Sequence, residues 1–179
     1  IEHAGCKRAL VLGTPEQAAS ARDLAASLAA LAAGTFTEAA MHTPFDVTER
    51  ALKTVAETKA DCTVAVGGGS TIGLGKAIAL RTDLTQFAIP TTYAGSEMTP
   101  IIGETKDGAK TTQRTPKVLP EVVIYDVDLT LTLPAGMSAT SGMNAIAHAV
   151  EALYAHDRNP VMTLMAEEAI GALGRALPA

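Results

Sequence analysis

The three consecutive glycines at residues 67–69 limit what this chain can fold into more than any other feature of the sequence. The segment 62–66 comes directly before them and is apolar and β-branched, which is the composition of a buried strand. A helical pattern follows over residues 71–80. Because strand, glycine loop and helix are contiguous, the sequence predicts a strand-to-helix turn of the kind found in α/β proteins.

The same glycines predict a site for a phosphate group. Glycine has no Cβ atom, so the backbone N–H groups of Gly68 and Gly69 can approach a phosphate closely, and the positive end of the helix dipole favours an anion there. Ser70 can add a hydroxyl group or cap the helix. A turn that serves only tight packing is the alternative interpretation. The spacing matches neither G-x-G-x-x-G nor G-x-x-x-x-G-K-[ST], because Ala77 follows Lys76.

Strands and helices alternate along the first part of the chain, and this alternation predicts a doubly wound parallel sheet covered by helices. Capping signals mark the starts of two helices, at Thr14-Pro15 and at Asp46. The predicted strands lie at residues 8–12, 37–41, 62–66, 87–89 and 122–125, and the predicted helices between them lie at residues 15–32, 46–58 and 71–80.

A hairpin and a helical region complete the predicted organisation. An Asp-Gly pair within residues 101–114 predicts a β-hairpin, and everything after residue 133 has helical periodicity. We therefore divide the chain into an α/β dinucleotide-binding domain, residues 1–133, and the first helices of an all-helical domain, residues 134–179. Because the chain starts at Ile1 and its last helix has an uncovered apolar side, we expect it to be part of a larger protein.

The composition excludes several classes of function. The net charge is -5 and no basic residues cluster, which argues against a nucleic-acid surface but not against a free nucleotide. No apolar run is long enough to span a membrane and no signal-peptide layout is present, so we expect a cytoplasmic protein. Cys6 and Cys62 form no C-x-x-C motif and are expected to be buried free thiols.

Two further groups of polar residues could carry chemistry. The loop after the predicted strand at residues 87–89 contains Thr91, Thr92 and Thr99, whose hydroxyls could contact a nucleotide. The alternative is an ordinary loop in which these hydroxyls form hydrogen bonds only with the loop's own backbone. Asn144 and His148 lie four residues apart on a helix, so both side chains can reach one ligand. Two such residues are too few to form a metal site by themselves. Alternatively, His148 could be a buried histidine with a purely structural role.

Three segments together resemble the iron-containing alcohol dehydrogenase superfamily: residues 67–76, 89–99 and 141–152. They occur in the order found in that family. The resemblance implies an N-terminal nucleotide-binding α/β domain and a C-terminal helical domain, with the active site between them. It also implies a cofactor, NADH or NADPH, bound by Gly68, Gly69, Ser70, Thr91, Thr92, Thr99, Lys110 and Thr14.

Departures from the family pattern carry further implications. Thr14 stands where many relatives have an acidic residue. A carboxylate there would bind both ribose hydroxyls and repel a 2′-phosphate, so threonine predicts that NADPH is accepted alongside NADH. Asn144 stands where metal-binding relatives have aspartate, with His148 as a second ligand, and Gly73 also replaces an aspartate. The resemblance therefore implies that no metal is required and makes Asn144 and His148 the candidate catalytic residues.

Within the superfamily, the sequence most resembles the maleylacetate reductases. That resemblance implies NAD(P)H-dependent reduction of 2-maleylacetate, a small dicarboxylate, to 3-oxoadipate in the bacterial degradation of aromatic compounds, by a homodimer. Two alternatives stay open. One is a metal-dependent alcohol or polyol dehydrogenase of the same superfamily, and the other is a non-catalytic nucleotide-binding module.

Overall fold

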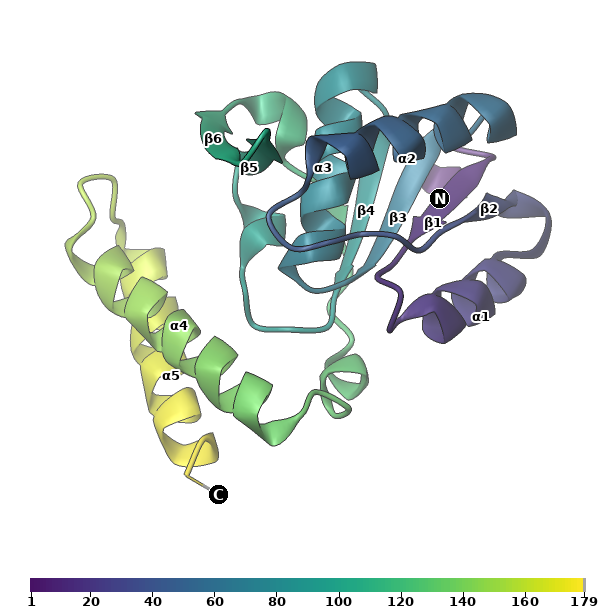
Figure 1. Cartoon of the computed structure of the whole chain (residues 1–179). Coiled ribbons are helices and arrows are strands. Elements are labelled where there is room, and N and C mark those ends of the chain that lie inside the picture. Colours follow the sequence, from purple (N-terminus) through teal and green to yellow (C-terminus); the bar gives the residue numbers. More distant parts are fainter. Residues whose placement is uncertain (179) are drawn as a thin grey trace.

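The computed structural model describes residues 1–178 as an α/β unit followed by a pair of long helices (Figure 1). A five-stranded parallel sheet forms the centre of the α/β unit, in the order β2-β1-β3-β4-β7. The strands are β1 (Ala9–Leu12), β2 (Ala32–Phe36), β3 (Cys62–Gly67), β4 (Thr85–Pro90) and β7 (Val122–Val123). The predicted parallel sheet is confirmed.

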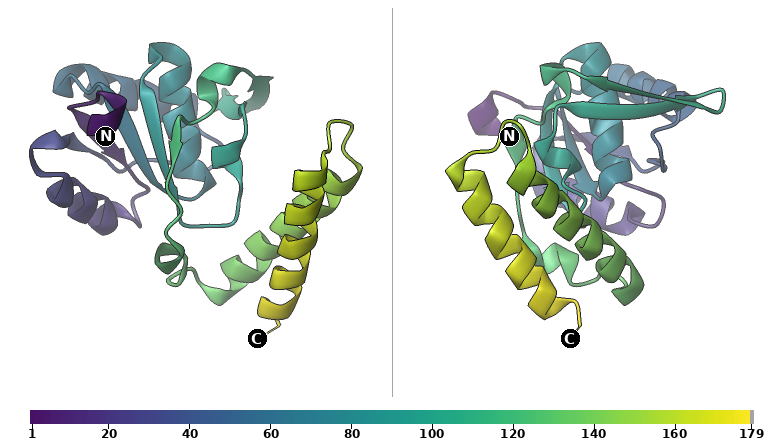
Figure 2. Two further views of the ribbon diagram at one scale, coloured as in Figure 1. Left: turned by 180° about the vertical axis from the view of Figure 1, so that it is seen from behind. Right: turned by 90° about the vertical axis from the view of Figure 1, so that its left-hand side faces the viewer.

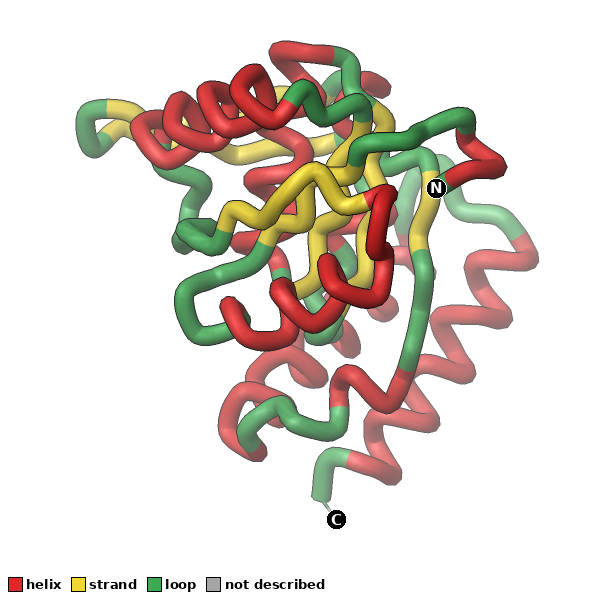
Figure 3. Tube along the Cα trace, turned by 90° about the vertical axis from the view of Figure 1, so that its right-hand side faces the viewer, coloured by secondary structure: helices red, strands yellow, loops and turns green. Residues whose placement is uncertain are grey.

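Helices cover both faces of this sheet (Figure 3). α1 (Ala18–Leu28) packs on one face, and α2 (Phe45–Thr58) and α3 (Gly69–Thr82) pack on the other. Successive residues of a strand point to opposite faces, so Leu10 and Leu12 join the core under α2 and α3, whereas Val11 joins the core under α1. Burial on both faces explains why the strands are apolar almost throughout.

The strand order reverses between β1 and β3. From β1 the chain passes to β2 on one side and then returns to β3 on the other side of β1. Loops that leave the carboxyl ends of β1 and β3 therefore diverge, and open α/β sheets bind ligands in the crevice at such a point. Because the glycine loop follows β3 directly, the topology places it at this crevice.

The predicted hairpin is also present, formed by the antiparallel strands β5 (Ile101–Lys106) and β6 (Ala109–Arg114). It lies against α2 and α3. Arg81 of α3 makes a salt bridge with Glu104 at 2.9 Å, and both Arg81 and Lys106 lie over the ring of Phe45. These contacts make the hairpin a wall beside α3. Short 3-10 helices lie at Glu2–Ala4, Ala29–Leu31, Ser96–Met98, Pro116–Val118 and Val127–Thr130.

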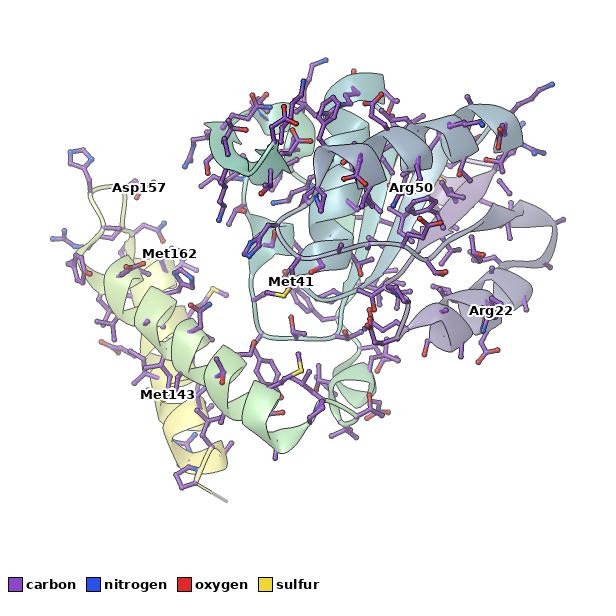
Figure 4. All side chains as sticks on the ribbon, in the orientation of Figure 1. Arg22, Met41, Arg50, Met143, Asp157 and Met162 are labelled. Carbon is purple, nitrogen blue, oxygen red and sulfur yellow. The ribbon has the colours of Figure 1, made fainter. Side chains whose placement is uncertain are left out.

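The helices α4 (Ala135–Tyr154) and α5 (Pro160–Ala176) pack against each other outside the α/β unit (Figure 2). The side chain of Asn159 caps α5 by accepting a hydrogen bond from the N–H of Met162 at 3.0 Å. Apolar side chains of this pair, including Met143 and Met162, stay exposed (Figure 4). Within residues 1–178, no helix combines the length and apolar character needed to cross a membrane.

Two strand predictions were wrong in position or length. The second strand was expected at residues 37–41 and lies instead at Ala32–Phe36, in a segment whose alanines favour a helix. Pairing with β1 determines where this strand forms, since Leu10 is in register with Gly34. Gly34 adopts a φ of 157° there. Pairing with a neighbouring strand therefore overrides local propensity at this position. The last strand covers only Val122–Val123 of the predicted 122–125.

Three helix starts also differ from the prediction. The N-cap residues are Gln17 for α1, Pro44 for α2 and Gly68 for α3, and none of them caps through its side chain. Ser70 therefore lies within the first turn of α3 rather than capping it. Asp46 does not cap α2 either, because it lies within the helix, where its carboxylate makes a salt bridge with Arg50 at 2.7 Å.

Candidate nucleotide-binding site

Three loops meet at the carboxyl edge of the sheet, after β1, β3 and β4. The N–H of Thr91 donates to the carbonyl oxygen of Gly67 at 3.0 Å, which joins the loops after β4 and β3. The side chain of Gln17 joins the loop after β1, because its Nε2 donates to Thr91 Oγ1 at 3.2 Å and its Oε1 accepts from the hydroxyl of Thr14 at 3.4 Å. The structure thus brings Thr14 and Thr91 together. Gln17 was not among the predicted cofactor residues, and its only signal in the sequence was its place three residues after Thr14.

The glycine loop keeps the start of α3 free of side chains. Gly67 has φ of 155°, and a Cβ atom on it would lie 2.5 Å from Thr71 Oγ1. A Cβ atom on Gly68 would lie 2.9 Å from Thr92 Cγ2, whereas one on Gly69 would meet nothing closer than 3.9 Å. The first N–H groups of a helix have no partner within the helix. The open space over Gly69 is therefore where a phosphate can reach them, so the loop fits a nucleotide.

A cavity of about 340 Å³ opens beside this loop, between α3, the segment before α2 and the hairpin. Its wall contains three of the predicted cofactor residues, Gly69, Ser70 and Lys110. Gly73 also lies in the wall. A Cβ atom there would lie 2.6 Å from Thr43 Oγ1, so an aspartate at this position would displace the side chain of Thr43. Glycine at this position thus allows the segment before α2 to approach α3 closely.

Lys76 is fully buried in α3, and its ammonium group binds the backbone of the loop after β4. Nζ donates to the carbonyl oxygens of Ser96, Thr99 (2.7 Å) and Ile101 (2.9 Å), and to the hydroxyl of Thr99 at 3.1 Å. Burial lowers the pKa of Lys76 to about 8, and the carboxylate of Glu97 opposes this shift. These oxygens occupy the ammonium group, so Lys76 is not free to bind an anion. The contacts also hold Thr99 in place.

A second cavity, of about 220 Å³, lies on the other side of the same loop. Thr92, Tyr93 and Tyr125 contribute to its wall. Glu97 is only 4% exposed; its Oε1 accepts from the hydroxyl of Tyr125 at 2.9 Å, and its Oε2 has no partner among residues 1–178. Partial burial and this carboxylate raise the pKa of Tyr125 to about 12. Glu97 therefore contributes to the wall of this cavity with one buried, unpaired carboxylate oxygen.

The helix α4 contacts this loop through Ser141, whose Oγ accepts a hydrogen bond from the N–H of Tyr93 at 3.0 Å. Asn144 and His148 follow three and seven residues later, so they lie on the same face of α4 as Ser141. Both residues are exposed, and Nδ1 of His148 lies 3.2 Å from Oε2 of Glu151. Neither of them lines the two cavities.

The residues of α4 do not make up an iron site by themselves. Asn144 offers a neutral amide oxygen and His148 an imidazole, whereas metal sites in proteins usually combine three or more donors. Among residues 1–178, the one cluster of three potential ligands lies elsewhere and consists of Cys6, Asp61 and Cys62. Within residues 1–178, α4 therefore supplies at most two donors for a metal ion at this place, Asn144 and His148.

The fold and the site define a doubly wound α/β unit whose glycine loop leaves room for a phosphate at a helix start. The chain belongs to the iron-containing alcohol dehydrogenase family, whose model matches residues 1–127. The resemblance stated from the sequence motifs is confirmed. The motif at residues 141–152 lies beyond the matched segment and contains Asn144 and His148.

Maleylacetate reductases and another member of the family are similar to this chain over nearly its whole length. The chain is 62% identical over 178 residues to a maleylacetate reductase from Rhizobium sp. (strain MTP-10005), covering 99% of this chain and 51% of that protein. It is similar to the crystal structure of maleylacetate reductase from Agrobacterium tumefaciens, with a TM-score of 0.95, 61% identity, and 99% and 51% coverage of the two chains. An iron-containing alcohol dehydrogenase from Corynebacterium glutamicum matches with a TM-score of 0.90, 42% identity, and 99% and 49% coverage. The chain spans about half the length of these relatives.

Proposed function

We propose that the protein containing this chain reduces 2-maleylacetate to 3-oxoadipate with NADH or NADPH, in the bacterial degradation of aromatic compounds. The observation that carries this proposal is the 62% identity to a maleylacetate reductase over 178 residues. Because the chain spans about half of that relative, the activity is proposed for the whole protein. We also propose that it acts in the cytoplasm as a homodimer, without a nucleic-acid or membrane partner.

The glycine loop supports a dinucleotide as the cofactor. We assign its pyrophosphate to the N–H groups of Gly68, Gly69 and Ser70, because a Cβ atom on Gly69 would face open space. The bound NAD(P)H supplies the hydride for the reduction. The hydroxyls of Thr91 and Thr92, with Thr14, Thr99 and Lys110, would orient the rest of the dinucleotide. Orientation of this kind holds the reacting atoms in one geometry and so lowers the entropic part of the barrier.

The contact between Ser141 and Tyr93 supports a role for α4 in binding the substrate. Since Asn144 and His148 share the face of Ser141, they project toward the α/β unit. We assign to this pair the neutralisation of charge on the substrate and to His148 the donation of a proton. A His148→Ala variant with unchanged turnover and substrate affinity would exclude this assignment.

An assay of the full-length protein tests the proposed reaction and its independence of metal. We expect rapid oxidation of NADH or NADPH with maleylacetate, little oxidation with small aldehydes, and the same rates with and without a chelator. The neutral side chain of Asn144 motivates the expected insensitivity to chelation. Loss of activity in the chelator would favour a metal-dependent alcohol or polyol dehydrogenase. Cofactor binding without oxidation of NAD(P)H would favour a non-catalytic nucleotide-binding module.

A Thr14→Asp variant tests the proposed tolerance of both cofactors. The aspartate carboxylate would accept from the ribose hydroxyls and repel a 2′-phosphate, so the ratio of kcat/KM for NADH to that for NADPH should rise roughly tenfold or more. Steady-state kinetics with both cofactors measure this ratio. Glu16 already places a carboxylate beside Thr14, and its pKa is held low by a backbone hydrogen bond and by the hydroxyl of Thr14. A Glu16→Gln variant should leave the ratio unchanged; if it alone shifts the ratio, Glu16 rather than Thr14 sets the preference.

A further inference from the structure

The amino end of the sheet carries a cluster of thiol and carboxyl groups that the proposed reaction does not use. Cys6 lies just before β1 and Cys62 is the first residue of β3, and these two strands are neighbours with Ala9 in register with Cys62 (Figure 1). The ligand atoms of Cys6, Asp61 and Cys62 all lie within 4.8 Å of one another. Strand pairing therefore brings together two thiols that are far apart in the sequence.

Burial and hydrogen bonding fix this cluster in place. Cys6 is 5% exposed and Cys62 is completely buried, while Asp61 reaches the surface. The carboxylate of Asp61 accepts from the N–H of Lys7 at 2.9 Å and from the N–H of Arg8 at 2.9 Å, and its own N–H donates to the carbonyl of Arg8 at 2.9 Å. These hydrogen bonds hold the ends of β1 and β3 in register. The ligand atoms are consequently preorganised before any ion arrives.

The donor set matches one class of cation. A tetrahedral zinc ion with Zn–S bonds of about 2.3 Å holds its ligand atoms roughly 3.5 to 3.8 Å apart, which small side-chain rotations of Cys6, Asp61 and Cys62 can reach. Two sulfur donors select soft or borderline ions over magnesium and calcium. The carbonyl oxygen of Ala4, 3.7 Å from Sγ of Cys6, provides a further oxygen near the cluster.

We propose that Cys6, Asp61 and Cys62 form a binding site for a thiophilic divalent cation of the zinc and cadmium class. Binding forms two metal–sulfur bonds and one metal–carboxylate bond. Each thiol releases its proton to solvent, so one ion displaces two protons, and water completes the coordination on the side of Asp61. The ion enters from that side, because Asp61 is the member of the cluster that reaches the surface.

The cation site is separate from the nucleotide site. Cys62 and Gly67 are the two ends of β3, and five residue steps of about 3.3 Å place them roughly 16 Å apart. An ion at the amino end therefore ties β1 to β3 without touching the glycine loop. We expect it to raise the thermal midpoint of unfolding and to leave NADH binding unchanged.

Titration of the reduced full-length protein with cadmium under anaerobic conditions tests the site. We expect the near-ultraviolet sulfur-to-cadmium charge-transfer band of this site to stop growing once one cadmium ion per chain has bound. Cys6→Ser and Cys62→Ser should each weaken binding at least 100-fold, and Asp61→Asn roughly tenfold. Asp61→Asn keeps one oxygen for the N–H groups of Lys7 and Arg8, so it stays informative if a cysteine variant fails to fold. The matched control Asp23→Asn, on the surface of α1, should bind like the wild type.

Three results would overturn the proposal. The first is a wild-type protein without a charge-transfer band at equimolar cadmium. The second is a band of full strength in both cysteine variants, which would place the ion on other thiols of the full-length protein. The third is a disulfide between Cys6 and Cys62 found by mass spectrometry in protein that was purified with a reductant.

Discussion

Replacing Lys76 with methionine is expected to lower the free energy of unfolding by about 3 kcal/mol or more. The ammonium group is completely buried and donates to three carbonyl oxygens, those of Ser96, Thr99 and Ile101. Methionine fills a similar volume but leaves these carbonyls without the donor that binds them. Urea unfolding of the full-length protein, followed by circular dichroism, measures the loss. The same variant should bind NADH more weakly, because the loop after β4 is no longer tied to α3.

Lys53→Met provides the matched control. Lys53 lies on α2 with its side chain 77% exposed, and its only ion pair within residues 1–178 is with Glu57 at 3.8 Å. Surface pairs of this kind contribute little, so the free energy of unfolding should change by less than about 0.5 kcal/mol. A loss in Lys76→Met no larger than in Lys53→Met would mean that Lys76 does not support this loop.

The sequence predicted those parts of the fold that depend on local chemistry. The glycine loop and the hairpin around Asp107 were found because turn residues restrict the backbone where they stand. The second strand was misplaced because its position depends on pairing with β1. The alanine-rich stretch before Gly34 favours a helix in isolation, and the ladder with β1 overrides that preference. Prediction from local patterns fails wherever a partner distant in sequence decides the outcome.

The same distinction applies to the candidate site. Gly69 and Ser70 were identified from the loop itself, and the structure places both in the wall of a cavity. Gln17 was missed because its role appears only when β1 and β4 lie in one sheet, bringing it to Thr91, which is 74 residues away. Glu97 was missed for a similar reason. Its place in the wall of the second cavity depends on its burial and on its hydrogen bond with the hydroxyl of Tyr125, and the sequence of a Ser/Thr-rich loop predicts neither.

Replacing Gly67 with alanine is expected to lower the free energy of unfolding by about 2 to 4 kcal/mol and to abolish measurable NADH binding. Gly67 has φ of 155°, which alanine rarely adopts, and the added methyl would lie 2.5 Å from Thr71 Oγ1 and 2.6 Å from Gln17 Oε1. Relief of these contacts requires the side chains of Thr71 and Gln17 to move. Because Gln17 also donates to Thr91, its displacement would loosen the link between the loops after β1 and β4. Urea unfolding and calorimetric titration with NADH measure the two effects.

Gly69→Ala separates the binding of phosphate from the stability of the fold. The added methyl would meet nothing within 3.9 Å, and alanine is favoured over glycine within a helix, so the free energy of unfolding should fall by no more than about 0.5 kcal/mol. The methyl would instead occupy the space that we assign to the pyrophosphate. The dissociation constant for NADH should therefore rise roughly tenfold or more, equivalent to about 1.4 kcal/mol. If Gly69→Ala binds NADH as tightly as the wild type while Gly67→Ala only unfolds, the loop serves strand-to-helix packing and the phosphate lies elsewhere.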